Sequence, residues 1–182
     1  MKYIGTNGVV AYGIIMYVGF IFVGTYMGYA VGSAPVISYH YGAGNKDELK
    51  NLFKRSLTII IVSSVVMTLI AEIIAGYLAG IFVSYDNNLL ELTTEAIRIY
   101  AVSYLISGIN IFASSFFTAL NNGVVSAVIS FMRMFVFQIV MILLLPVVLG
   151  ISGIWTAVIA AEVLSVVISV MFLVKNRKKY SY

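Results

Sequence analysis

Cysteine is absent from the sequence, and histidine occurs once, as His40. Without cysteine the chain can form neither a disulfide framework nor a thiolate metal site, and one imidazole leaves too few nitrogen ligands for a zinc site. Charged residues are scarce as well, since they make up 10% of the 182 residues and about 25% of an ordinary soluble domain. The composition therefore argues against a metalloenzyme and against a soluble domain.

Signatures of enzymes and of nucleotide-driven pumps are also missing. The sequence has no phosphate-binding Gly-Lys-Ser/Thr loop, no His-Glu-x-x-His motif and no acidic cluster of the kind that a membrane prenyltransferase needs. We therefore predict that the protein is not an enzyme and that it binds no metal or other cofactor. Its energy would then come from an ion gradient, of protons or of sodium.

Apolar residues dominate the sequence instead, because 62% of the chain is hydrophobic and its mean hydropathy is +1.04. A helix needs about 20 apolar residues to cross a bilayer, and five stretches meet that need, near residues 9–41, 57–83, 96–120, 124–149 and 151–174. Only Gly150 to Gly153 separate the last two, which predicts a tight helical hairpin. We predict an all-α integral membrane protein, in which residues 1–182 form a single transmembrane domain surrounded by lipid.

Basic residues lie in short blocks beside the apolar stretches, so the net charge of +4 predicts no binding to nucleic acid. Short cytoplasmic loops are enriched in lysine and arginine, and eight such residues flank the spans on one side: Lys46, Lys50, Lys54, Arg55, Lys175, Arg177, Lys178 and Lys179. On the other side, the basic residue outside the spans is Lys2. This asymmetry predicts a plasma-membrane protein with its N-terminus outside and its C-terminus in the cytoplasm. An odd number of spans that begins outside also suggests that a preceding span is missing.

Glycine recurs at every fourth position in the first span, at Gly24, Gly28 and Gly32, with Pro35 just beyond. This spacing places the three glycines on one helix face and allows close backbone approach of a neighbouring helix in lipid. The same thin face, next to a proline, would also let the helix bend or slide during a conformational cycle. Both interpretations, packing and hinge, remain open for these four residues.

Polar residues recur at helical spacing in the third span, at Ser103, Ser107, Asn110, Ser114, Ser115 and Thr118. Such a stripe is costly to expose to lipid. Either these groups hydrogen-bond to neighbouring helices and to the backbone, where each bond contributes about 0.6 kcal/mol, or they line an aqueous cavity. Four of them are therefore candidates for a substrate or ion pathway: Ser107, Asn110, Ser114 and Thr118.

Three charged residues lie within the apolar spans, namely Glu72, Arg133 and Glu162. A charge at the bilayer centre costs at least about 2.5 kcal/mol, so each is a candidate for the same pathway. Arg133 and Glu162 lie on adjacent antiparallel helices at depths that differ by about 3 Å at 1.5 Å per residue, which predicts a buried ion pair. The pair would be either structural or part of a proton or substrate pathway, whereas Glu72 has no obvious partner at its depth.

Motifs at both ends of the first span resemble those of the multidrug and toxic compound extrusion (MATE) transporters. The opening of the span matches at Gly8, Ala11, Tyr12 and Gly13. Its end, GSAPVISYHYGAGN, matches at Gly32, Pro35, Ile37, Ser38, Tyr41, Gly42, Ala43 and Asn45. The likeness extends through SGINIFASSFFTALNNG to the last hairpin. The resemblance implies a partial C-terminal lobe, with five of the six transmembrane helices of such a lobe.

Proteins of this family look like two six-helix lobes around a central cavity, and they exchange cationic amphiphilic compounds for protons or sodium. The resemblance implies that this chain is part of an ion-coupled antiporter that exports small cationic organic substrates, such as drugs and other xenobiotics. Its partner would be the absent N-terminal lobe, with a homo-oligomer as the less favoured alternative. The segment from Pro35 to Asn45 would lead into an amphipathic return. Asn110 stands where some sodium-coupled relatives have an aspartate, so the resemblance does not support a sodium site there.

Two other functions remain open. A lipid-linked saccharide flippase of the same superfamily would be expected to have a more cationic cavity than Arg133 alone provides. A non-transporting membrane scaffold subunit would fit a chain that supplies one lobe only. Further spans encoded upstream of Met1 would favour the transporter.

Cysteine labelling tests the orientation directly, because the chain has no cysteine of its own. We expect thiols introduced at positions 45 and 182 to resist a membrane-impermeant reagent in intact cells, and a thiol at position 88 to react. The physical reason is the asymmetry of lysine and arginine between the two sides. The opposite labelling pattern would show that the orientation is reversed.

Overall fold

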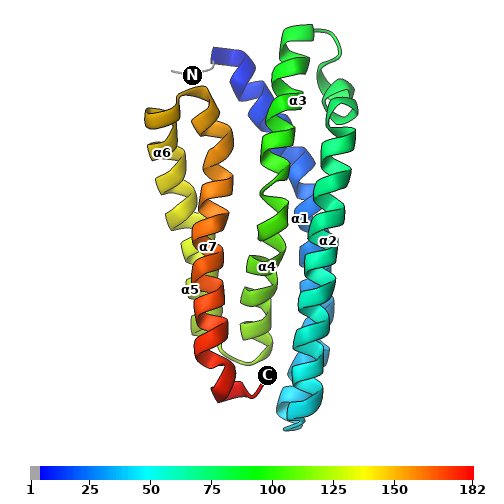
Figure 1. Cartoon of the computed structure of the whole chain (residues 1–182), viewed down its shortest axis with the longest axis vertical. Coiled ribbons are helices and arrows are strands. Elements are labelled where there is room, and N and C mark those ends of the chain that lie inside the picture. The colour runs from blue at the N-terminus through cyan, green and yellow to red at the C-terminus, as the bar shows by residue number, and fades with distance from the viewer. Residues whose placement is uncertain (1–4) are drawn as a thin grey trace.

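A computed structural model describes residues 5–182, apart from the side chains of Thr6 and Ile151. This part of the chain is a bundle of long helices (Figure 1), in the order α1 Gly5–Gly42, α2 Lys46–Val83, α3 Asn87–Ala101, α4 Tyr104–Ala119, α5 Gly123–Phe131, the π-helical segment η1 Met132–Phe137, α6 Gln138–Leu149 and α7 Ile151–Tyr180. Within the described residues, four helices are long and apolar enough to cross a membrane, or five if the bent pair α3 and α4 is one span. The all-α membrane fold expected from the sequence is confirmed.

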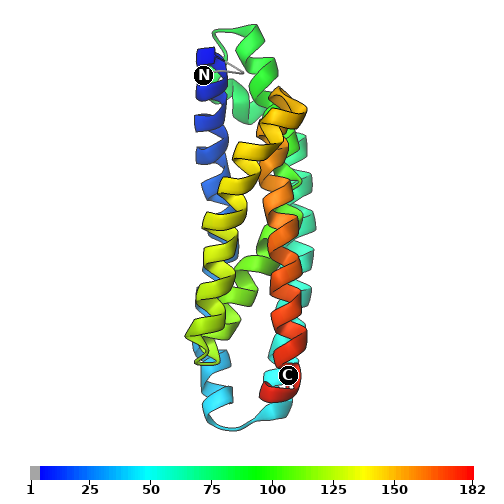
Figure 2. The same ribbon diagram turned by 90° about the vertical axis from the view of Figure 1, so that its left-hand side faces the viewer.

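The connections of the bundle lie at two opposite ends (Figures 1 and 2). The start of α1, the α2–α3 connection and the α6–α7 hairpin lie at one end, whereas the α1–α2 turn, the α4–α5 turn and the C-terminus lie at the other. The two basic blocks therefore share one end, while Lys2 lies outside the described residues. Tyr182 is only 4% exposed because its ring packs against Phe53. The exposed Lys178 is therefore the better labelling position at that end.

The segment after α1 is a tight turn that leads directly into α2. Gly44 has a φ of +69°, a conformation that side chains disfavour and glycine adopts readily. The side chain of Asn45 then accepts a hydrogen bond of 3.1 Å from the backbone N–H of Glu48, which caps α2. From Lys46, α2 continues without interruption to Val83. The basic residues thus form the first turns of the long helix itself.

The third expected span, residues 96–120, consists of two helices, α3 and α4, that meet at an angle of 47°. At the joint, the backbone N–H of Leu105 bonds to the carbonyl of Val102 at 3.3 Å, so it leaves the carbonyl of Ala101 without its usual helical donor. The hydroxyl of Thr68 in α2 donates to that carbonyl at 3.4 Å. Because a free carbonyl is costly in lipid, this side chain stabilises the bend.

Helix α4 lies at the centre of the bundle, where it contacts α1, α2, α5 and α7 and is seen between α2 and α7 in Figure 1. Three of its aromatic side chains are fully buried: Phe112, Phe116 and Phe117. The buried face of α2 carries alanine at every fourth position, at Ala71, Ala75 and Ala79. The rings lie beside the other half of α2, where Phe53 contacts Phe112 and Phe116. The small alanines, which follow Thr68 along α2, allow close approach of a neighbouring helix in lipid.

The close approach between helices occurs at Gly108 in α4. A Cβ there would lie 2.8 Å from the Oγ of Ser64 and 3.0 Å from the side chain of Ile60, both in α2. In contrast, a Cβ on any of the three glycines of α1 would meet nothing within 4 Å: Gly24, Gly28 and Gly32. No helix of the described residues packs closely on these glycines, so both interpretations of their face and of Pro35, packing and hinge, stay predictions.

The α6–α7 hairpin turns at a single residue, Gly150, which has a φ of +62° and a ψ of −134°. This region is essentially restricted to glycine. The first turn of α7 then passes so close to α6 that a Cβ at Gly153 would clash with the carbonyl of Leu145. Both glycines of the predicted hairpin are thus required by its geometry.

A valine at position 108 tests the close approach of α4 and α2. We expect Gly108→Val to lower the free energy of unfolding by about 1–3 kcal/mol, because the added methyl groups would overpack the contact with Ser64 and Ile60. Unfolding in mixed micelles with increasing SDS measures the change. The control is Gly24→Val, which adds the same atoms on an open face; an equal loss in both variants would contradict the packing role of Gly108.

Candidate functional site

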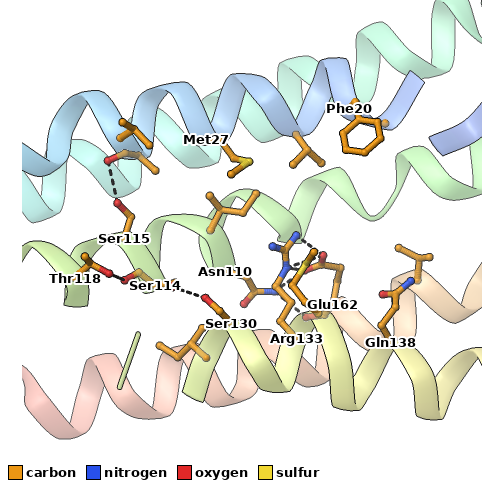
Figure 3. A pocket seen from close by; sticks show the side chains of 18 of the residues that line it. Phe20, Met27, Asn110, Ser114, Ser115, Thr118, Ser130, Arg133, Gln138 and Glu162 are labelled. Carbon is orange, nitrogen blue, oxygen red and sulfur yellow. Dashed lines mark hydrogen bonds and ion pairs between the residues drawn. The ribbon is translucent and has the colours of Figure 1, made fainter. Parts of the chain in front are cut away.

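A groove of about 890 Å³ opens along α1, α4, the stretch from α5 to α6, and α7. Helix α1 supplies an apolar wall: Met16, Phe20, Val23, Met27, Val31, Ala34 and Pro35. Polar side chains lie on the facing wall: Asn110, Ser114, Ser115, Thr118, Ser130, Arg133, Gln138 and Glu162. Figure 3 shows Phe20 and Met27 on α1 across the groove from Asn110, Arg133 and Glu162. The groove is therefore amphipathic.

The predicted ion pair between Arg133 and Glu162 is confirmed and lies in this polar wall. Arg133 Nη2 and Nε lie 2.7 Å and 2.9 Å from Glu162 Oε1, and Nε also lies 3.1 Å from Oε2. The two side chains are 14% and 8% exposed. Arg133 belongs to η1 and Glu162 to α7, so the pair joins these two segments. Separation of the two charges would be costly in an apolar bundle, which holds the segments together.

Asn110 joins the same network from α4. Its amide donates to Glu162 Oε2 at 2.7 Å and to the backbone carbonyl of Glu162 at 3.1 Å, while its Oδ1 accepts from the hydroxyl of Ser169 at 2.8 Å. The carboxylate and the backbone carbonyl of Glu162 are both acceptors only, so the amide nitrogen of Asn110 must face them. An aspartate in this position could not donate to a Glu162 carboxylate, and two carboxylates would repel each other. The asparagine therefore complements Glu162 chemically.

A second polar cluster occupies the groove nearer to the α4–α5 turn. Ser114 Oγ lies 2.9 Å from Ser126 Oγ and 2.7 Å from Ser130 Oγ, and Thr118 Oγ1 lies 2.7 Å from Ser126 Oγ. Ser115, one residue along, donates to the carbonyl of Ala30 in α1 at 3.0 Å. These hydroxyls link α4 to α5 and to α1, and they remain partly accessible from the groove.

For the polar stripe of the third span, the sequence left two interpretations open: hydrogen bonds to neighbouring helices and to the backbone, or the lining of a cavity. The structure supports the first for some of these residues and both for others. Ser107 is 3% exposed, does not line the groove, and donates to the carbonyl of Ser103 at 2.9 Å, so its bond is structural. Asn110, Ser114 and Thr118 line the groove and also bond to neighbouring helices. Cavity lining and helix packing are therefore combined in the same side chains.

Glu72 is not brought to this site. It is partly buried on α2, which does not contribute to the lining of the groove. Within the described chain, the salt bridge found is that between Arg133 and Glu162, so Glu72 has no basic partner there. The structure gives no support for grouping it with the other two charged residues.

The sequence analysis missed several lining residues. On α1, Met16, Phe20, Val23 and Met27 follow a spacing of three and four residues, which marks one helix face, but every neighbouring position is apolar too. Gln138 stands alone as an amide in an apolar stretch, and it lies five residues after Arg133. An α-helical periodicity would not place these two on one face, whereas the π-helical segment does.

Removal of one charge from the pair tests its contribution to stability. We expect Glu162→Gln to lower the free energy of unfolding by up to about 3–5 kcal/mol, because Arg133 would keep its charge in a largely buried position. The double variant with Arg133→Met should recover part of this loss. Denaturation in detergent measures both. Glu72→Gln is the matched control, for which we expect a change within about 0.5 kcal/mol; equal losses in all three variants would contradict the pairing.

Comparison with solved structures gives the same fold. The chain is 19% identical to the Vibrio cholerae MATE transporter VcmN in its bent form, with a TM-score of 0.88 over 97% of this chain and 40% of that one. An outward-facing multidrug resistance MATE family transporter is 18% identical, with a TM-score of 0.88 over 98% of this chain and 40% of that one. The inward-facing structure of such a transporter gives a TM-score of 0.79 at 18% identity, over 94% and 38%.

The chain thus spans about 40% of the length of the solved structures that it matches. No curated protein sequence matches it. The MatE family model matches residues 1–144, a range that contains both motifs of α1, the bend between α3 and α4, and Arg133 in η1. By this match over most of its length, the chain belongs to the MatE family.

Proposed function

We propose that this chain is part of an ion-coupled secondary antiporter, driven by protons or sodium, that exports cationic amphiphilic drugs and other xenobiotics. The observation that carries the proposal is the amphipathic groove, in which an apolar wall from α1 faces a polar wall with a buried carboxylate. In this role, residues 5–182 supply one wall of a larger cavity. The membrane family to which the chain belongs supports the proposal.

The groove suits the apolar part of such a substrate. Met16 and Met27 are flexible and polarisable, so they adapt to ligands of different shape. Phe20, Tyr12 and Tyr100 also line the groove, and aromatic faces attract organic cations. A wall of this kind favours broad selectivity for size and apolar character over recognition of one molecule.

Glu162 is the residue on which coupling to an ion would depend. Its carboxylate accepts bonds from Arg133 and Asn110, and a proton on either oxygen would remove the charge that holds Arg133. A proton and a cationic substrate would then compete for the same carboxylate, which is the basis of exchange. With sodium as the driving ion, Na⁺ and the cationic substrate would compete for the same carboxylate oxygens of Glu162.

Assembly with an N-terminal lobe completes the proposal. Alternating access in transporters built from repeats moves one repeat against another around a central site. The groove described here would form one side of that site, and the N-terminal lobe would form the other. We place the protein in the plasma membrane, with its N-terminus outside and its C-terminus in the cytoplasm, on the basis of its lysine and arginine distribution. Self-association into a homo-oligomer is the alternative way to close the groove.

A lipid-linked saccharide flippase is less well supported. Its substrate carries phosphate groups, which call for free cations in the cavity. Among the described residues that line the groove, the one cation is Arg133, and it is already bound to Glu162. A scaffold subunit without transport activity would not need a groove of this kind, and the experiment below separates it from the transporter.

Efflux of an ethidium-like cation tests the proposed function. We expect no gradient-dependent efflux from liposomes that contain the 182-residue chain alone, because one wall cannot alternate access. Efflux should appear when an N-terminal lobe is supplied. Glu162→Gln should then reduce the rate per folded molecule at least about tenfold, because loss of the shared carboxylate removes the coupling between proton and substrate.

Glu72→Gln is the control, since it removes a carboxylate outside the groove. Efflux by the chain alone would contradict the need for a second lobe. Absence of efflux with the lobe supplied and the complex assembled would favour the scaffold subunit.

A further inference from the structure

A second hollow, of about 230 Å³, lies away from the groove, between α2 and α7 at the end of the bundle where the C-terminus lies (Figure 1). Its lining residues are Lys50, Phe53, Lys54, Leu173, Val174, Arg177 and Tyr182. Three of these seven side chains are cationic and the others are apolar or aromatic. The proposed transport cycle does not use any of them.

Two cations of this hollow, Lys50 and Lys54, have no anionic partner in the described chain, whereas Arg177 lies beside the terminal carboxylate of Tyr182. Lys50 and Lys54 are four residues apart on α2, so they lie on one face of that helix, and Arg177 faces the same hollow from α7. The salt bridge that residues 5–182 contain is the pair in the groove. Three cations and one carboxylate leave a net positive charge around this small hollow, which favours an anionic ligand.

Arg177 is held in place at this hollow. Its Nε donates to a terminal carboxylate oxygen of Tyr182 at 3.3 Å, and the hydroxyl of Tyr182 donates to the carbonyl of Leu173 at 2.8 Å. The ring of Tyr182 also packs against Phe53, with 4.6 Å between the ring centres. The Nε of Arg177 is thus used within the protein, and its two terminal nitrogens can donate to a ligand.

The rest of the hollow is apolar. Leu173 is buried and Phe53 is partly buried at its surface, and Val174 is 69% exposed beside it. Exposed valines continue from Val174 along the same face of α7, at Val170, Val167 and Val163. A small soluble anion would gain nothing from this surface, whereas an acyl chain would.

We propose that this hollow binds an anionic phospholipid of the cytoplasmic leaflet, with its phosphate between Lys50, Lys54 and Arg177. One acyl chain lies against Phe53, Leu173 and Val174. The charges and the apolar surface are complementary to the two parts of such a lipid, and basic pockets between membrane helices on the cytoplasmic side have this chemistry. The inference depends on the predicted orientation of the basic end and is independent of the function of the groove.

Native mass spectrometry of the full chain in detergent tests the proposal, with phosphatidylglycerol or phosphatidylcholine of identical acyl chains as the added probe. We expect the chain to retain phosphatidylglycerol at least about tenfold more tightly than phosphatidylcholine, because each basic residue near the phosphate adds to its binding. The triple variant Lys50→Gln, Lys54→Gln, Arg177→Gln should lose this preference. The conservative variant Lys50→Arg, Lys54→Arg should keep it.

The matched control is the triple variant Lys46→Gln, Lys175→Gln, Lys178→Gln, which removes the same charge from exposed positions outside the hollow. Retained preference in the control supports a defined site. Equal loss in both triple variants, or equal binding of the two lipids by the parent chain, would overturn the proposal. Displacement of phosphatidylglycerol by an equal concentration of glycerol phosphate would also overturn it, because the site would then recognise a free anion without the acyl chains.

Discussion

The buried pair of Arg133 and Glu162 is the interaction on which the arrangement of the C-terminal half depends. Two opposite charges in an apolar bundle must stay together, because each alone would lose its hydration without compensation. Their contact fixes η1 against α7. Asn110 extends the network to α4, where it also accepts a hydrogen bond from Ser169. Because the two charges cancel, the groove has polar groups without a net charge, and its affinity for a cation would depend on how easily the pair opens.

Much of the fold could be predicted from the sequence, because an apolar helix in lipid has few alternatives. The all-α membrane class and the glycine hairpin at Gly150 follow from local sequence alone. The joint between α3 and α4 does not, since it requires Thr68 of another helix to satisfy a carbonyl at the bend. The close approach at Gly108 was missed for a similar reason: glycine spacing is visible in the sequence at Gly24, Gly28 and Gly32, but the partner of a glycine is not.

The candidate site was only partly predictable. The similar depth of Arg133 and Glu162 in the membrane was enough to predict their pairing, because charges are rare in spans and an unpaired one is costly. The role of these two residues in transport stays a prediction. The apolar wall of the groove carried no signal, since residues such as Phe20 and Met27 differ little from those that face lipid. Glu72 shows the limit of the charge argument, because depth alone does not say which helix face a carboxylate occupies.

The π-helical segment η1 has a consequence for the phase of the helix that contains it. Ile129, Ser130, Arg133 and Met134 line the groove up to the wide turn, and Gln138 and Ile142 line it beyond. A π-helical turn holds one residue more than an α-helical turn, which changes the phase of the helix that follows by about 100° at 3.6 residues per turn. The wide turn thus works as a one-residue frame shift in space. All residues of α6 keep the new phase, among them Gln138 and Ile142 on the wall of the groove.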